Sequence, residues 1–146
     1  MTQGSVRATE AARRFWASHG GDATTPEKVA VAAESVFARL QTGLARWVGA
    51  EGVRALTGRA LELAQPAHPP LGACSGAAVD RQAVEAAARA HGAAEVATSL
   101  ITVIATLIEL LGRVVGEEMA VRMVEQTGAP SPRGASSSAG QGGRDG

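Results

Sequence analysis

The chain has few aromatic side chains: Phe, Trp and Tyr make up 3% of its 146 residues, and tyrosine is missing altogether. Hydrophobic residues nevertheless amount to 45% of the sequence, so aliphatic side chains and alanine must build the core. A composition rich in Ala, Leu and Val without Tyr favours α-helices. We therefore expect an all-α protein, and the length is that of one ordinary domain.

An excess of either charge is also lacking, because 14 basic residues balance 14 acidic ones. The longest basic run is Arg13-Arg14. Proteins that bind nucleic acids usually carry a basic stripe or a basic excess. Nucleic acid is therefore not expected as a partner.

Cysteine is limited to Cys74, so no internal disulfide can form. This suits a reducing compartment, and the N-terminus lacks the apolar run of a secretory signal. Basic charge is almost all Arg, and together with the many Ala and Gly residues this is typical of a GC-rich bacterial coding sequence. We expect a bacterial, cytoplasmic protein.

Catalytic and cofactor motifs are likewise missing. Cys74 lies in G-A-C-S-G, which fits the letters of a nucleophile elbow, but that elbow requires a strand before it, whereas a proline-rich segment precedes this one. The three histidines and Cys74 are too scattered for a recognised metal motif. We therefore expect no catalytic residues, no metal and no cofactor, and interpret the chain as non-enzymatic.

The segment 94–115 is the most apolar in the chain, and it predicts a central, largely buried helix. Apolar residues recur every three or four positions along two adjacent rows, which is a helical pattern with a wide apolar face. The first row is Val96, Leu100, Val103, Leu107, Leu110 and Val114, and the second is Ile101, Ile104, Ile108, Leu111 and Val115. The uncharged part, 96–108, is shorter than the ~20 residues that cross a bilayer, so membrane insertion remains only the alternative.

Other helices are predicted on both sides of this segment. Thr25-Pro26-Glu27 is a strong helix start, and the pattern predicts a hairpin over 25–64, with helices 25–48 and 51–64. The inward row of the second helix is predicted to be Val53, Leu56, Ala60 and Leu63. A Pro/Gly-rich connection over 65–79 should be irregular. A short helix over 80–91, capped by Asp80 and separated from the next helix by Gly92, is followed by a second hairpin over 93–127. Together these segments complete a domain at 25–127. Residues 1–24 are expected to be an N-terminal arm that is frayed over 1–8 and forms a short helix over 9–18. Residues 128–146 are expected to be a disordered tail.

The two hairpins resemble each other at a spacing of 67 residues. L-x-R-x-V-G-x-E occurs at 44–51 and again at 111–118. Arg suits a helix C-terminus, and Gly suits the turn that follows. We interpret this as an internal duplication that builds a four-helix bundle. In the alternative, each half pairs with a second chain.

Five residues are candidates for binding a partner, because aromatic residues and methionine are common at interfaces. They are Phe15, Trp16, Trp47, Met119 and Met123. The competing interpretation is that they pack in the core.

The expected function is that of a non-enzymatic interaction or adaptor protein. It would bind another protein, or itself as a homo-oligomer, through an aliphatic helix face. One alternative is a membrane-associated protein that uses helix 94–115. Another is a helix-turn-helix regulator of DNA, although its candidate second helix, 51–64, carries Glu51 and Glu62 beside Arg54 and Arg59.

Overall fold

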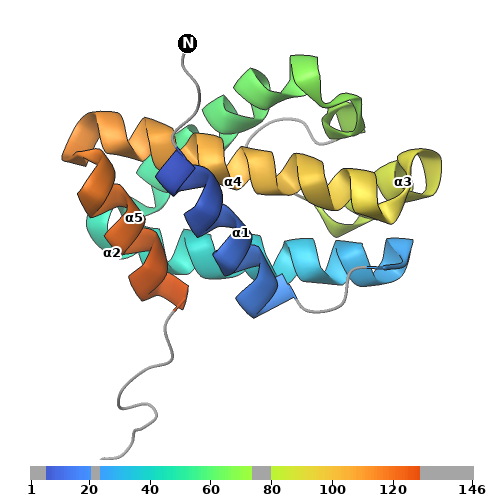
Figure 1. Ribbon diagram of the computed structural model, residues 1–146, viewed down its shortest axis with the longest axis horizontal. Coiled ribbons are helices and arrows are strands. Elements are labelled where there is room, and N and C mark those ends of the chain that lie inside the picture. Colours follow the sequence, from blue (N-terminus) through green and yellow to red (C-terminus); the bar gives the residue numbers. More distant parts are fainter. Residues whose placement is uncertain (1–5, 21–23, 74–79, 129–146) are drawn as a thin grey trace, which may run out of the picture.

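The computed structural model describes residues 6–20, 24–73 and 80–128, and this part of the chain is helical and contains no strand (Figure 1). The all-α prediction is therefore confirmed. The five α-helices are α1 (Val6–Gly20), α2 (Pro26–Ala64), α3 (Arg81–His91), α4 (Ala93–Val115) and α5 (Glu117–Gly128). Two short 3₁₀ helices, η1 (Gln65–Ala67) and η2 (Pro69–Ala73), follow α2. Cys74 and the predicted tail beyond Gly128 lie outside the described residues.

Helix α4 is the centre of the molecule, as its two apolar rows predict. It contacts each of the other four α-helices, and Leu100, Leu107 and Ile108 on its surface are completely buried. Its apolar rows are therefore used mostly for packing within the chain. The exceptions lie at its C-terminal end, where Val114 and Val115 are exposed.

Helix α2 begins at its predicted cap and bends at its predicted stop. The hydroxyl of Thr25 accepts a hydrogen bond from the backbone N–H of Lys28 at 3.2 Å, and Pro26 occupies the first turn. At Gly49 the backbone leaves the helix (φ 82°, ψ 157°) and then resumes it. Gly116 takes a similar conformation (φ 97°, ψ 145°) between α4 and α5. Both predicted turns are thus formed at glycine, which tolerates a positive φ.

Helix α1 is longer than the predicted 9–18 and packs into the bundle. It contacts α2, α4 and α5, and it buries Ala8, Ala12, Phe15 and Trp16. Residues 6–20 are therefore not a separate arm. The prediction that residues 1–8 are frayed was wrong for residues 6–8, which are helical, and Ala8 belongs to the buried face of the helix.

The segment 50–64 of α2 buries its predicted face in part, since Val53 and Ala60 are buried as predicted. Thr57, Leu61 and Ala64 are buried, whereas Leu63, placed inward by the sequence pattern, is exposed. Residues three apart and residues four apart both lie on one face of a helix, so the sequence allows more than one buried row. The direction in which the helix continues after the bend at Gly49 determines which row faces the core.

The connection after α2 is more regular than predicted. A 3₁₀ helix needs only hydrogen bonds between residues three apart, and two such bonds occur, from the N–H of His68 to the carbonyl of Gln65 (3.0 Å) and from Leu71 to His68 (2.9 Å). The side chain of Leu71 is buried in the core. The prolines therefore shorten the helices here without abolishing them.

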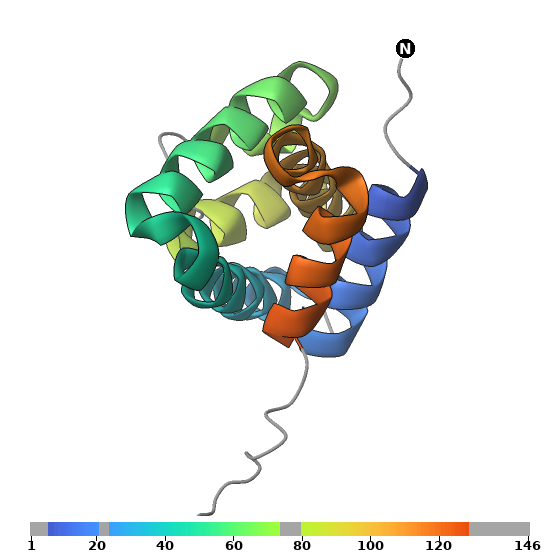
Figure 2. The same ribbon diagram turned by 90° about the vertical axis from the view of Figure 1, so that its left-hand side faces the viewer.

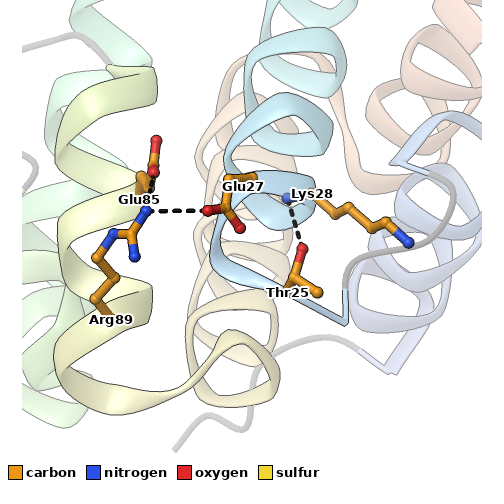
Figure 3. A network of polar contacts seen from close by, with 5 residues as sticks. All are labelled: Thr25, Glu27, Lys28, Glu85 and Arg89. Atoms are coloured by element: carbon orange, nitrogen blue, oxygen red, sulfur yellow. Dashed lines mark hydrogen bonds and ion pairs between the residues drawn. The ribbon is translucent and has the colours of Figure 1, made fainter.

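Helix α3 is fixed against α2 by two ion pairs. Arg89 contacts Glu27 at 3.0 Å (Figure 3), and Arg81 contacts Glu34 at 3.5 Å. Glu27, near the start of α2, pairs with Arg89 near the end of α3, and Glu34 pairs with Arg81 at the start of α3. The two helices are therefore antiparallel. At its start, the side chain of Asp80 accepts a hydrogen bond from the N–H of Ala83 at 3.2 Å, as the capping prediction requires.

Helix α5 crosses the first half of α2 at a very close approach. A Cβ atom added to Gly43 would lie 2.3 Å from the side chain of Thr127. Glycine at this position therefore lets the end of α5 contact α2.

Candidate functional site

Exposed apolar side chains gather at the two glycine turns. They are Trp47 beside the bend of α2, Val114 and Val115 at the end of α4, and Met119 in the first turns of α5, all between 39% and 72% exposed. Both turns lie at the left-hand end of the molecule in Figure 1, and this end faces the viewer in Figure 2. We call these four residues the end face.

The end face is formed where the apolar residues of two helices continue beyond the part of each helix that is buried in the core. The last turn of α4 continues both apolar rows beyond the level at which neighbouring helices cover them, so Val114 and Val115 meet solvent. Gly116 then turns the chain into α5, whose next exposed apolar residue is Met119. Trp47 likewise lies in the last helical turn before a glycine, Gly49, and is exposed.

The five predicted partner-binding residues divide into two groups. Phe15, Trp16 and Met123 are buried and pack in the core, and the Phe15 ring lies 4.8 Å from that of His19. Trp47 and Met119 are the two whose side chains are exposed to solvent. Alanines on the same helical face signalled the burial of Phe15 and Trp16. Val114 and Val115 were missed as surface residues because they continue the rows of α4.

Charges of both signs flank the end face. Arg46 and Arg113 precede the two turns and Glu51 follows the first of them, and all three side chains are exposed. None of the three closes an ion pair with another described residue. These charged side chains therefore lie unpaired, close in sequence to the exposed apolar residues of the two turns.

A serine and a histidine meet elsewhere, between α4 and the connection. The Oγ atom of Ser99 lies 3.2 Å from Nδ1 of His68, and the hydroxyl donates to the carbonyl of Glu95 at 3.0 Å. The hydroxyl of Ser99 and Nδ1 of His68 thus form a hydrogen bond whose donor depends on the tautomer of the imidazole. Ser99 is completely buried and His68 contacts no carboxylate among the described residues, so the pair holds the connection on α4 and lacks the access that a nucleophile needs.

Other chemical sites receive little support in the described part of the chain. No group of three or more His, Cys, Asp or Glu residues that could hold a metal ion occurs there. Cys74 and the rest of its G-x-C-x-G pattern after Ala73 lie outside it. In the helix predicted to read DNA, Arg59 contacts Glu62 at 3.5 Å, which offsets one of its two cations.

The shifted pKa values belong to the α2–α3 contact. A backbone hydrogen bond lowers the pKa of Glu27, partial desolvation opposes that shift, and the charge of Arg89 adds to it. The pKa of Arg89 is raised chiefly by Glu85 and further by Glu27. The side chains of Glu27 and Arg89 are largely exposed and that of Glu85 is 29% exposed, so these contacts are ion pairs near the protein surface.

One described helix, α4, is long and apolar enough to cross a membrane. It has 23 residues with a mean hydropathy of 1.8 over its best window, half of which is buried inside the protein. A core helix has the same properties, so the observation leaves both interpretations of α4 standing.

Comparison with known proteins found no matching family model, no matching curated protein and no matching solved structure. Function must therefore be inferred from this chain's own residues.

Proposed function

We propose that this protein is a non-enzymatic interaction module of the cytoplasm that binds a protein partner, or a second copy of itself, through the end face. The observation that carries the proposal is the exposure of Trp47, Val114, Val115 and Met119 beside the two helix turns. Trp is enriched among the residues that dominate binding energy. Met adapts its shape to varied surfaces, so the patch combines a rigid anchor with an adaptable contact.

The proposal moves the binding surface from the middle of the central helix to its end. Leu100, Val103 and Leu107 are buried within the chain, and a partner could reach them only after the bundle opened. Val114 is 72% exposed and needs no such opening. The aliphatic surface available for binding is therefore that of the end face.

We also propose that two duplicated hairpins form a four-helix core, with α1 and α3 added to it. The support is the coincidence of Arg46, Gly49 and Glu51 with Arg113, Gly116 and Glu118 at one fixed spacing. The conformation of the glycines alone supports less, since Gly92 outside the repeat also has a positive φ. The duplication would explain why exposed apolar residues occur at both turns.

The test compares substitutions on the end face with a matched substitution elsewhere. Val114→Ser and Trp47→Ser remove exposed apolar surface at the end face. Val31→Ser is the control, because Val31 is 50% exposed and lies 16 residues before Trp47, about 24 Å along α2. All three variants should fold, since none of the three side chains belongs to the buried core.

Association is measured by sedimentation velocity over a range of concentrations and by affinity capture from the host at mild salt. The expected result is a complex or homo-oligomer that survives Val31→Ser and is lost in Val114→Ser and Trp47→Ser. Monomeric behaviour with no captured partner, or a complex that both end-face variants retain, would refute the proposal.

The composition of α4 favours one second candidate, a membrane-associated protein whose central helix leaves the bundle. Its support is the length and hydropathy of α4. Insertion would require α4 to give up its contacts with four other helices. Co-flotation with vesicles of anionic phospholipid, accompanied by loss of protease resistance in α1 and α2, would favour this candidate over the end face.

A further inference from the structure

Helices α1 and α5 lie side by side and run in the same direction (Figures 1 and 2), and charges of alternating sign line the cleft between them. The cleft has a volume of about 300 Å³. From α1 come Arg7, Glu10 and Arg14, and from α5 come Glu118, Arg122 and Glu125, with Val121 as the one apolar residue of the lining. The spacing brings a positive residue of one helix to the level of a negative residue of the other.

At one end of the cleft two opposite charges form an ion pair, and at the other end, which we call the open end, the charged side chains are unpaired. Arg14 contacts Glu125 at 3.0 Å. Arg7, Glu10, Glu118 and Arg122 make no ion pair with any described residue. Between α2 and α3, by contrast, opposite charges that face each other do meet. The open end of the cleft therefore holds two guanidinium and two carboxylate groups separated by space.

The volume and the charges together define what could fill this space. The whole cleft, with its Arg14–Glu125 end, measures about 300 Å³, which is the lower limit for small-molecule sites, so only a small ligand fits the open end. A simple anion would be attracted by the two arginines but repelled by Glu10 and Glu118. A simple cation would be attracted by the two glutamates but repelled by the two arginines. A ligand that carries both charges can satisfy both kinds of group, because guanidinium binds a carboxylate in a fork and a glutamate accepts from an ammonium group.

We propose that the open end of the α1–α5 cleft binds a small zwitterion, an amino acid or a short peptide. Its carboxylate contacts Arg7 and Arg122, and its ammonium group contacts Glu10 and Glu118. Exposed ion pairs contribute little each, so the dissociation constant should be on the order of 1 mM. Because these pairs face solvent, added salt should weaken the binding.

The test is a titration of ¹⁵N-labelled protein with glycylglycine, followed by backbone amide shifts. N-acetylglycylglycine and glycylglycine amide are the control ligands, and each lacks one of the two charges. We expect saturable shifts confined to residues 7–14 and 118–125, with both control ligands about tenfold weaker. The result does not depend on the end face, so failure here would leave that proposal standing.

Variants of the protein make the test specific to the cleft. Arg122→Gln and Glu10→Gln each remove one charge from the open end, and either should weaken glycylglycine binding about two- to fivefold. Arg59→Gln is the matched control, since Arg59 is an exposed arginine on α2, and it should bind like wild type. Absence of saturable shifts, equal affinity for the blocked ligands, or unchanged affinity in both cleft variants would overturn the proposal.

Discussion

Replacing Gly49 by alanine should destabilise the protein through the backbone alone. Gly49 has φ 82° and ψ 157°, a region that residues with a Cβ atom adopt at a cost of about 1–3 kcal/mol. A Cβ at this position would meet nothing within 4 Å, so no steric clash adds to that cost. Alanine also lowers the conformational entropy of the unfolded chain, which stabilises the folded state by about 0.4–1 kcal/mol. The expected net loss is about 1–2 kcal/mol.

The matched control is Gly52→Ala, three residues further along the same helix. Gly52 is helical, and alanine is favoured there over glycine by about 1 kcal/mol. Its Cβ would lie 3.3 Å from the side chain of Val48, which removes part of that gain. Gly52→Ala should therefore be neutral or slightly stabilising, and the two variants should differ by about 2 kcal/mol.

Urea unfolding followed by circular dichroism at 222 nm measures both variants, because helix content reports on the whole described fold. Gly116→Ala should behave like Gly49→Ala, since Gly116 also has a positive φ and an unobstructed Cβ position. If Gly49→Ala unfolded at the same urea concentration as Gly52→Ala, the reasoning from the backbone at residue 49 would be refuted.

Three further perturbations test the core, the α2–α3 contact and the connection. Leu107→Ala should cost about 2–5 kcal/mol in urea unfolding, because the side chain is completely buried in α4; a loss below about 1 kcal/mol would contradict its central place. Because the folded-state pKa of Glu27 is lowered, its stabilising effect exists above the ordinary pKa and disappears as the pH falls through the lowered one. Thermal melts should show Glu27→Gln less stable than wild type at neutral pH and the difference vanishing in acid, whereas a difference that grows in acid would contradict the sign. Ser99→Ala removes the partner of His68 and should cost about 1 kcal/mol, so a melting temperature equal to that of wild type would show that the pair does not hold the connection.

Much of the secondary structure could be predicted from the sequence because its signals are local. The cap at Thr25, the cap at Asp80 and the glycines at 49, 92 and 116 act within a few residues of themselves. Such signals survive whatever the rest of the chain does. The predicted helix boundaries around 25–64 and 93–127 accordingly lie close to those of the structure.

Which face of each helix is buried was harder to predict where the rows are short. In α4 two complete rows of aliphatic residues allow only one orientation. The segment after Gly49 offers Leu56, Leu61 and Leu63, which point in different directions, and the structure buries Leu61 most completely. The outcome depends on how the bend presents this segment to α4, and that information is not local.

The end face shows a second limit of reasoning from periodicity. The rows of α4 run without a break through Val114 and Val115, so the pattern predicts burial for both. Burial, however, depends on whether a neighbouring helix covers the same level, and Val114 and Val115 are exposed. A helix that remains apolar beyond its own neighbours exposes surface that this chain does not use for its own packing. This mismatch between the length of the apolar rows and the extent of the core is the physical basis for expecting a partner at the end face.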